Sequence, residues 1–225
     1  PLTCETLPQL FREAQAAAAL PADLYEFRAD FFRESPSQAL RMLRDSLPRP
    51  LIFTLRTKGQ GGQADISGEE YERRLLEIIN LDQDAACGLL DIELACQDDR
   101  VLRLVRAAKS RGMLSIVSHH DFAHTPDSSC MLDLLRKMRS LGADLPKLAV
   151  MPSSPKDVLS LMEVTLQASM ELGPVVTMSM GRLGQLSRIG GGLTGSVISF
   201  AAGPRPSAPG QLMAADLRSI LDILC

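Results

Sequence analysis

Short apolar segments alternate with longer amphipathic segments along the chain, and this alternation limits the possible folds more than any other feature of the sequence. Seven apolar segments of eight or nine residues are present: residues 23–30, 50–57, 87–94, 112–120, 143–151, 173–180 and 195–202. Segments this short are typical of buried strands, and the segments between them have the period of helices. Strands that alternate with helices form βαβ units and a parallel sheet.

Two of the amphipathic segments, residues 68–80 and 128–142, predict helices most clearly. In the second segment Leu132, Leu135 and Met138 lie on one helical face, and a glycine follows where the pattern stops. We therefore expect this face to pack against the sheet.

The two ends of the chain complete the pattern. The first three residues, "PLT", predict the stub of another strand, because a helical segment over residues 7–20 follows them, and residues 215–225 predict a last helix. Eight βα units in a chain of 225 residues are typical of a TIM barrel. The sequence thus predicts an α/β fold, a (β/α)8 TIM barrel formed as a single domain by residues 1–225, with the first strand truncated at Pro1.

An open, doubly wound sheet is the alternative arrangement of βαβ units. Its usual signature is a GxGxxG turn after the first strand, and the sequence has no such turn. The glycine-rich residues 59–63 and 190–195 lack this spacing, so we expect them to form loops that do not cradle a phosphate.

Composition excludes several classes of function. The formal net charge is −3 and the lysines and arginines are scattered, which argues against a nucleic-acid surface. No segment approaches the roughly 18 consecutive apolar residues of a membrane span, and the five cysteines form no CxxC pair. We expect a soluble cytoplasmic protein with reduced thiols that binds neither nucleic acid nor membranes.

Charged or reactive side chains lie near the carboxyl ends of the apolar segments. They are Glu26, Arg28, Arg56, Asp91, Glu93, His119, His120, Lys147 and Ser179. Because the carboxyl ends of barrel strands meet on the face that holds the active site, we expect these side chains to converge in one pocket. The alternative is that inward polar groups only satisfy one another inside the barrel.

All three histidines of the chain lie within six residues, at His119, His120 and His124. A metal site is not expected, because the spacing matches no HExxH or His-x-His motif and adjacent histidines of a strand point to opposite sides. We expect one histidine to enter the pocket as an acid and base, and the strand register decides which one.

Lys147 interrupts an apolar segment, unlike the other lysines, which lie in polar surroundings. A desolvated lysine has a lowered pKa, so its free amine can form a Schiff base with a ketone. The imine would acidify the adjacent carbon, and a nearby histidine could remove its proton. The alternative is a structural lysine that reaches solvent or pairs with a carboxylate such as Glu93. A Schiff-base role of Lys147 therefore predicts carbon-acid chemistry on a carbonyl compound.

Eight segments in sequence order resemble the type I 3-dehydroquinate dehydratases of the shikimate pathway. They are "YEFRADFF" (25–32), "FTLRTKGQGG" (53–62), "LLDIEL" (89–94), "SHHDFAHTP" (118–126), "KLAVMP" (147–152), "TMSMGRLGQLSRI" (177–189), "GSVISF" (195–200) and "SAPGQL" (207–212). The resemblance covers nearly the whole chain. It implies a lyase that dehydrates 3-dehydroquinate to 3-dehydroshikimate in aromatic amino acid biosynthesis, without a metal or cofactor.

The resemblance also implies roles for the two reactive residues. Lys147 matches the family lysine that forms a Schiff base with the C3 ketone of the substrate. His120, directly before "DF", matches the family histidine that removes the C2 proton and then helps the C1 hydroxyl to leave. His119 and His124 are then bystanders or neighbours of the site.

Further positions match the substrate-binding residues of the family. Glu26, Arg28 and Arg56 are implied to contact the ring hydroxyls, and Arg188 is implied to hold the carboxylate with its bidentate fork. A loop that contains Ser207 and Gln211 closes over the substrate in the family. Asp91, Glu93 and Gln60 are expected to support these groups.

Two alternatives to a dehydratase stay open. An aldolase or transaldolase barrel would use the same lysine, but such enzymes usually bind a substrate phosphate, for which no cradle is evident. A non-catalytic barrel could bind a quinate-like ligand for regulation, although it would need neither Lys147 nor His120. A homodimer is a further expectation.

The sequence departs from the family at Pro1, where many members contribute a polar group, and at Gln60, where the family has a glutamate. A carboxylate raises the pKa of a neighbouring histidine, whereas an amide does not. We therefore predict that Gln60→Glu shifts the acid limb of the pH–rate profile of dehydration. An unchanged profile would remove Gln60 from the mechanism.

Overall fold

The computed structural model describes residues 1–82, 87–203 and 206–224, which form two compact units, Pro1–Ser115 and Ile116–Cys225. Each unit is an α/β structure of parallel strands and helices. The two units are described separately below.

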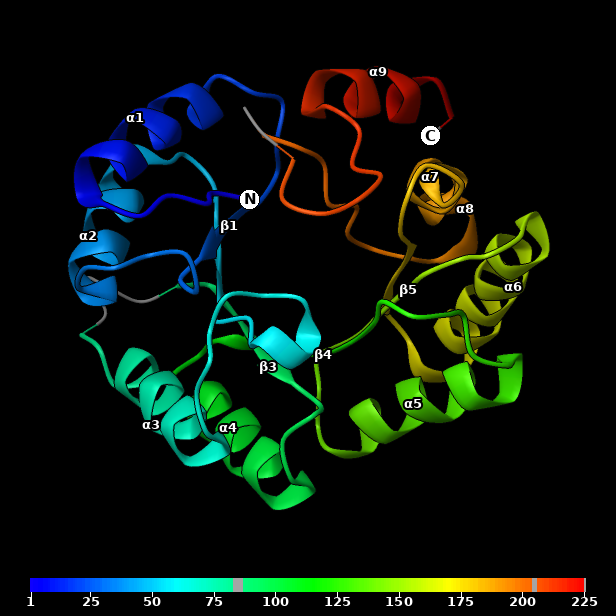
Figure 1. Ribbon diagram of the computed structural model, residues 1–225, viewed down its shortest axis with the longest axis horizontal. Coiled ribbons are helices and arrows are strands. Elements are labelled where there is room, and N and C mark those ends of the chain that lie inside the picture. Colours follow the sequence, from blue (N-terminus) through cyan, green and yellow to red (C-terminus); the bar gives the residue numbers. More distant parts are fainter. Residues whose placement is uncertain (83–86, 204–205, 225) are drawn as a thin grey trace. The chain divides into compact units, whose positions relative to one another are not determined.

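The first unit contains helices and strands in regular alternation (Figure 1). Its elements are α1 (Leu7–Ala18), β1 (Tyr25–Arg28), α2 (Pro36–Ser46), β2 (Leu51–Thr54), the 3-10 helix η1 (Lys58–Gln60), α3 (Gly68–Ile79), β3 (Leu89–Glu93) and α4 (Asp98–Ser110). Strand β2 pairs in parallel with both β1 and β3. Leu2 forms an isolated parallel bridge to Phe27 of β1, so the predicted strand stub is present as a bridge.

The register of these strands separates an apolar face from a polar face. Phe27 is aligned with Phe53, and Phe53 with Leu90. All three side chains are buried, and the two phenylalanine rings meet edge to face at 5.9 Å. Because successive side chains of a strand alternate in direction, the opposite face of the same strands presents Glu26, Arg28 and their neighbours.

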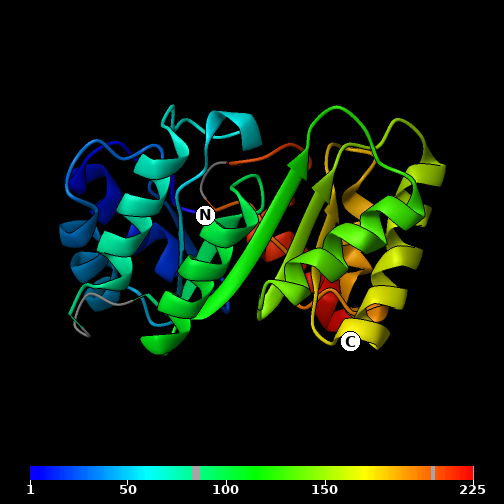
Figure 2. The same cartoon turned by 90° about the horizontal axis from the view of Figure 1, so that it is seen from below.

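The second unit begins within β4 (Leu114–Asp121). Its further elements are α5 (Ser128–Ser140), β5 (Leu145–Val150), α6 (Pro155–Leu172), β6 (Val176–Ser179), α7 (Gln185–Ile189), α8 (Gly191–Thr194) and α9 (Ala214–Leu224). Figure 2 shows β4 and β5 side by side in the same direction, and β6 continues this parallel sheet.

Helix α6 covers one face of the second sheet. The helix starts at a capping box, in which the Ser154 and Asp157 side chains bond to each other's backbone N–H groups. In its middle, the hydroxyl groups of Thr165 and of Thr177 in β6 lie 2.6 Å apart. Leu148 of β5 is aligned with Thr177, so the face with Leu148 packs against α6 and the other face, with Lys147, points away from it.

The structure confirms most of the predicted helices. Residues 68–80 form α3, and residues 128–142 form α5, in which Leu132, Leu135 and Met138 are buried. Of the predicted last helix, α9 covers every residue up to Leu224, while Cys225 lies outside the described residues. None of the described helices combines the length and hydropathy that crossing a membrane requires.

The prediction of a strand over residues 195–202 was wrong. Only Ser196 and Ala202 make single parallel bridges, to Val175 and Met213. Val197 still donates to the Val175 carbonyl, but Ser199 and Phe200 bond to Arg188. The Phe200 carbonyl accepts from its guanidinium, and the Ser199 hydroxyl donates to its carbonyl. The Phe200 carbonyl is thus used by a side chain where a ladder would use a strand N–H.

Two smaller predictions also need correction. The predicted loop over residues 190–195 contains the single helical turn α8. Ser179 was expected in the pocket, but its alignment with Val150 places it on the sheet face that α6 covers. Its backbone N–H donates a hydrogen bond of 2.9 Å to the Ser187 hydroxyl of α7.

Candidate functional site

The first unit gathers five predicted site residues on one face of its sheet. This first-unit cluster consists of Glu26, Arg28, Arg56, Asp91 and Glu93, all of which are buried. The register aligns Arg28 with Thr54 and Thr54 with Asp91. Glu26 and Glu93, two residues from these positions, therefore point to the same face.

Arg56 is the centre of the first-unit cluster. Its guanidinium lies 2.8 Å from the Asp91 carboxylate and 3.1 Å from that of Glu93. Glu93 also accepts hydrogen bonds from the backbone N–H and the hydroxyl of Thr57, at 2.9 and 2.6 Å. Two strand ends are thus tied together by charge-assisted bonds, which are roughly twice as strong as neutral ones.

Burial and charge act in opposite directions on the pKa values of this cluster. Burial opposes the charge of Arg56, but Asp91 and Glu93 together outweigh burial and raise the pKa of Arg56. Burial raises the pKa of Glu93, although Arg56 and Thr57 counteract it. The Tyr71 hydroxyl, which accepts a bond from the Glu93 backbone N–H, has a raised pKa because it is buried beside these carboxylates.

The other two members of the cluster have separate partners. Glu26 accepts a hydrogen bond of 2.8 Å from the Thr54 hydroxyl. Arg28 donates two bonds of 2.8 Å to Asp30, and its guanidinium lies 5.0 Å from the centre of the Phe31 ring. The sequence analysis singled out neither Thr54 nor Asp30, although Asp30 belongs to the "YEFRADFF" motif.

Gln60 lies in a tight loop that follows β2. The loop closes where Thr57 bridges Ala64, and the Gly62 N–H donates to the Thr57 carbonyl at 2.8 Å. A side chain on Gly62 would meet the Arg56 carbonyl oxygen at 2.1 Å. Gln60 itself is buried. The loop therefore directs the residue at the position of the family glutamate toward the protein interior.

In the second unit two predicted residues, Lys147 and Arg188, contact Phe200, and a third, His120, shares the sheet face of Lys147. These four residues are named the second-unit cluster. The Lys147 ammonium lies 4.3 Å from the centre of the Phe200 ring, a cation–π contact, and only 3% of the residue is exposed. Phe200 was not predicted from the sequence, because the contact joins residues that are far apart in the chain.

The strand register identifies the histidine that accompanies Lys147. Ser118 is aligned with Lys147 and His120 with Ala149, so His120 shares a sheet face with Lys147 and His119 points to the opposite face. Burial lowers the pKa of His119, and Asp121 partly counteracts this effect. The structure thus places His120, and not His119, on the sheet face of Lys147.

His124 lies apart from this face. Its Nδ1 atom lies 3.2 Å from the Asp121 carboxylate, and its side chain is largely exposed. Among the described residues there is no group of three or more histidine, cysteine, aspartate or glutamate side chains that could hold a metal ion. The three histidines therefore have three different environments.

Arg188 is buried without a carboxylate partner among the described residues. Its guanidinium donates to the carbonyl oxygens of Phe200 at 3.1 Å and Pro209 at 3.5 Å, and it contacts the Met178 sulfur at 3.7 Å. Met178 is aligned with Ala149, so this contact lies on the sheet face of Lys147 and His120. Burial lowers the pKa of Arg188 to about 10.

Ser207 and Gln211 form one hydrogen-bonded turn. The Gln211 amide oxygen accepts from the Ser207 N–H at 2.7 Å, and the amide nitrogen donates to the Ser207 hydroxyl at 3.2 Å. Within this turn Gly210 has a φ of 77°, and a side chain there would meet the Gly181 carbonyl oxygen at 2.0 Å. The turn therefore packs directly on the loop after β6.

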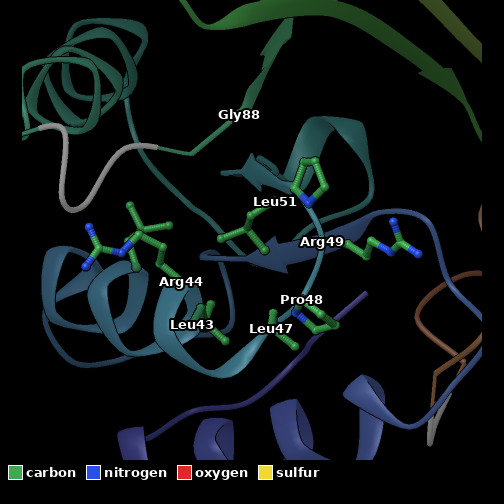
Figure 3. Close-up of a pocket in the computed structure, with 9 residues that line it drawn as sticks. Leu43, Arg44, Leu47, Pro48, Arg49, Leu51 and Gly88 are labelled. Carbon is green, nitrogen blue, oxygen red and sulfur yellow. The ribbon is translucent and has the colours of Figure 1, made fainter.

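A cavity of about 230 Å³ lies elsewhere in the first unit (Figure 3). Leu51 and Gly88, at the amino ends of β2 and β3, are part of its wall, with residues of α2 and the segment that follows it. The predicted residues lie at or beyond the carboxyl ends of these strands. The cavity contains none of the predicted site residues.

The comparisons with known proteins decide the family. A family model described as type I 3-dehydroquinase matches residues 1–225. The chain belongs to the type I 3-dehydroquinase family. The predicted family and the predicted enzyme class, a type I 3-dehydroquinate dehydratase, are therefore confirmed.

Individual members of the family resemble the chain over its whole length. The 3-dehydroquinate dehydratase of Klebsiella pneumoniae (strain 342) is 39% identical, over 100% of this chain and 91% of the relative. That of Syntrophotalea carbinolica is 40% identical, over 100% and 90%. The crystal structure of the 3-dehydroquinate dehydratase from Geobacillus kaustophilus matches with a TM-score of 0.94 and 37% identity, over 100% of this chain and 89% of that chain.

A further solved member of the family also matches the whole chain. The type I 3-dehydroquinate dehydratase of Clostridium difficile, solved with covalently modified comenic acid, matches with a TM-score of 0.93 and 35% identity. The alignment covers 100% of this chain and 90% of that chain.

We predict that Gly62→Ala lowers the free energy of unfolding by about 1–3 kcal/mol, because the new methyl group overlaps the Arg56 backbone. Gly59→Ala in the same loop is the matched control, since nothing lies within 4 Å of its added carbon. This control should change stability by less than about 0.5 kcal/mol. Urea denaturation of both variants measures the difference, and equal stabilities would contradict the close packing of this loop.

Proposed function

We propose that this chain dehydrates 3-dehydroquinate to 3-dehydroshikimate through a Schiff base on Lys147. The main support is the second-unit cluster, in which a buried lysine shares a sheet face with His120 and contacts Phe200, whose carbonyl binds Arg188. A buried amine, an imidazole and a guanidinium are the groups that ketone activation, proton transfer and carboxylate binding require.

The proposed reaction needs no metal or cofactor. The neutral amine of Lys147 attacks the C3 ketone, and uptake of one proton from solvent with loss of water forms an iminium ion. His120 removes a C2 proton, and the electron pair of that C–H bond moves into the iminium to give an enamine. The enamine then expels the C1 hydroxyl, which takes the proton from His120 and leaves as water. Hydrolysis of the remaining imine releases the product and restores Lys147.

Arg188 is proposed to bind the substrate carboxylate. A buried guanidinium without a counter-ion is costly, and its lowered pKa expresses this cost. A carboxylate would restore the missing charge through two parallel hydrogen bonds. Ser207 and Gln211 are proposed to close over the substrate and to exclude water from the imine. Their turn includes Pro209, whose carbonyl accepts a hydrogen bond from Arg188.

Glu26, Arg28 and Arg56 are proposed to bind the ring hydroxyls of the substrate. Arg56 already has two carboxylate partners, so a further anion would gain little from its charge, whereas a neutral hydroxyl can still exchange hydrogen bonds with the cluster. Asp91 and Glu93 would keep Arg56 in place, and Gln60 is proposed to support the site from the loop position at which the family has a glutamate.

We predict that borohydride reduction in the presence of 3-dehydroquinate leaves a covalent adduct on Lys147, detected by peptide mass spectrometry. Lys147→Met should abolish both the adduct and the dehydration activity. Lys156→Met is the control at an exposed lysine of α6 and should change neither.

The same experiment separates the alternatives. Binding of 3-dehydroquinate without an adduct or turnover would favour the non-catalytic binder. An adduct without dehydration, together with cleavage of a carbon–carbon bond in a sugar phosphate, would favour an aldolase-type enzyme. Either result would contradict the proposed reaction.

We also propose that residues 1–225 form a single (β/α)8 barrel domain that works in the cytoplasm. The named strands and the bridge that the first residues make at Leu2 support this proposal. The structure shows no disulfide at the cysteines among the described residues, Cys4, Cys87, Cys96 and Cys130, as expected in a reducing compartment. The proposed partner is a small-molecule substrate, 3-dehydroquinate. Binding to nucleic acid or to membranes is not part of the proposal.

A homodimer is the last part of the proposal. Leu159, Leu166 and Met170 of α6 are 59, 47 and 81% exposed, and their spacing places them on one helical face. Exposed apolar faces of this kind are typical of subunit interfaces.

We predict that sedimentation equilibrium shows a dimer and that Met170→Glu converts it to a monomer. The control Gln15→Glu adds the same charge at an exposed polar position of α1 and should leave the dimer intact. A monomeric wild type, or a dimer that survives Met170→Glu, would exclude this face as the interface.

A further inference from the structure

We infer that Asp30 is a specificity-determining residue: it neutralises Arg28 inside the protein, so that Arg28 binds a neutral group of the substrate and does not attract an anion. This inference rests on the proposed function. It assigns a role to a residue that does not itself need to touch the substrate.

The contact between Asp30 and Arg28 is a complete bidentate ion pair. Both Asp30 oxygens accept from Arg28 at 2.8 Å. The Asp30 side chain is fully buried and that of Arg28 is 10% exposed, so solvent screens the pair little. The Phe31 ring lies 5.0 Å from the guanidinium carbon and limits its movement further.

Asp30 also holds the loop that contains Gln60. Its Oδ2 atom, which already accepts from Arg28, accepts a hydrogen bond of 3.0 Å from the Gln63 N–H. One carboxylate therefore connects the end of β1 with the loop after β2. Loss of its charge would release Arg28 and weaken the anchor of this loop at the same time.

The two units differ in which charged residues they bury, and this difference shows why the neutralisation of Arg28 matters. In the described part of the first unit, Arg28 and Arg56 are buried together with the carboxylates of Glu26, Asp91 and Glu93. In the described part of the second unit, Lys147 and Arg188 are the only buried charged residues. Pairing thus leaves the arginines of the first unit with little attraction for an anion, whereas Arg188 has no carboxylate partner among the described residues.

The test compares Asp30→Asn with wild type in steady-state dehydration of 3-dehydroquinate, with inorganic sulfate as a competing anion. The asparagine keeps the size of the side chain but removes its charge. We expect the KM to rise and sulfate to inhibit about tenfold more strongly or more, the range expected for hydrogen bonds to a charged group. Unchanged sulfate inhibition would overturn the inference.

Two further variants serve as controls. Asp65→Asn removes a carboxylate from the exposed pair with Lys58 and should leave both the KM and the sulfate inhibition unchanged. Asp30→Glu keeps the negative charge beside Arg28, so its sulfate inhibition should stay near the wild-type value. Equal sulfate sensitivity of the glutamate and asparagine variants would show that shape, not charge, matters at this position, and would overturn the inference.

A measurement without substrate separates this inference from the proposed function. Sulfate should raise the melting temperature of Asp30→Asn more than that of wild type, and the added Arg28→Gln substitution should abolish the excess. This outcome supports neutralisation of Arg28 even if the chain does not dehydrate 3-dehydroquinate, whereas an excess that persists in the double variant contradicts it. If Asp30→Asn does not fold by itself, folding of the variant in the presence of sulfate supports the inference. A variant that fails to fold even with sulfate overturns the inference.

Discussion

The buried ion pairs of Arg56 with Asp91 and Glu93 are the constraint on which the first unit depends. They join the carboxyl ends of β2 and β3 with the loop that begins at Thr57. Charges in such a position are tolerated only when they are paired and hydrogen-bonded, and removal of one partner typically costs about 3–5 kcal/mol. The arrangement is therefore stable as a whole but sensitive to each of its members. A site built this way keeps its geometry before any substrate arrives.

The buried arginine of the second unit has a different environment. Lys147 and Arg188 are the buried charged residues in the described part of this unit. Lys147 contacts the Phe200 ring, and Arg188 contacts two carbonyl oxygens and the Met178 sulfur. Arg188 has no carboxylate partner among the described residues, so these contacts accommodate its guanidinium without cancelling its charge. The first unit, in contrast, pairs both of its buried arginines with carboxylates.

Local patterns predicted much of the fold and of the site. The period of the apolar residues located α3 and α5, and the motifs singled out Lys147 and His120, which the structure places on one sheet face. The strand over residues 195–202 was wrongly predicted because its apolar composition does not show that the carbonyl of Phe200 accepts from Arg188. Thr54 and Phe200 were missed because their partners lie on other segments, and no local period records such a contact. Asp30 was missed although its partner Arg28 is only two residues away, because the pattern does not show that these two side chains meet.

The sequence by itself determined the βα alternation, the family and the residue types available for chemistry, because period, motif and order are properties of the chain alone. Tertiary structure alone decided which of two adjacent histidines shares a face with Lys147, since the pairing of β4 with β5 sets that direction. It also decided which arginines are neutralised, because Arg28 and Arg56 meet carboxylates while Arg188 meets carbonyl oxygens. The physical reason is that charge compensation depends on distances between atoms, and folding sets those distances.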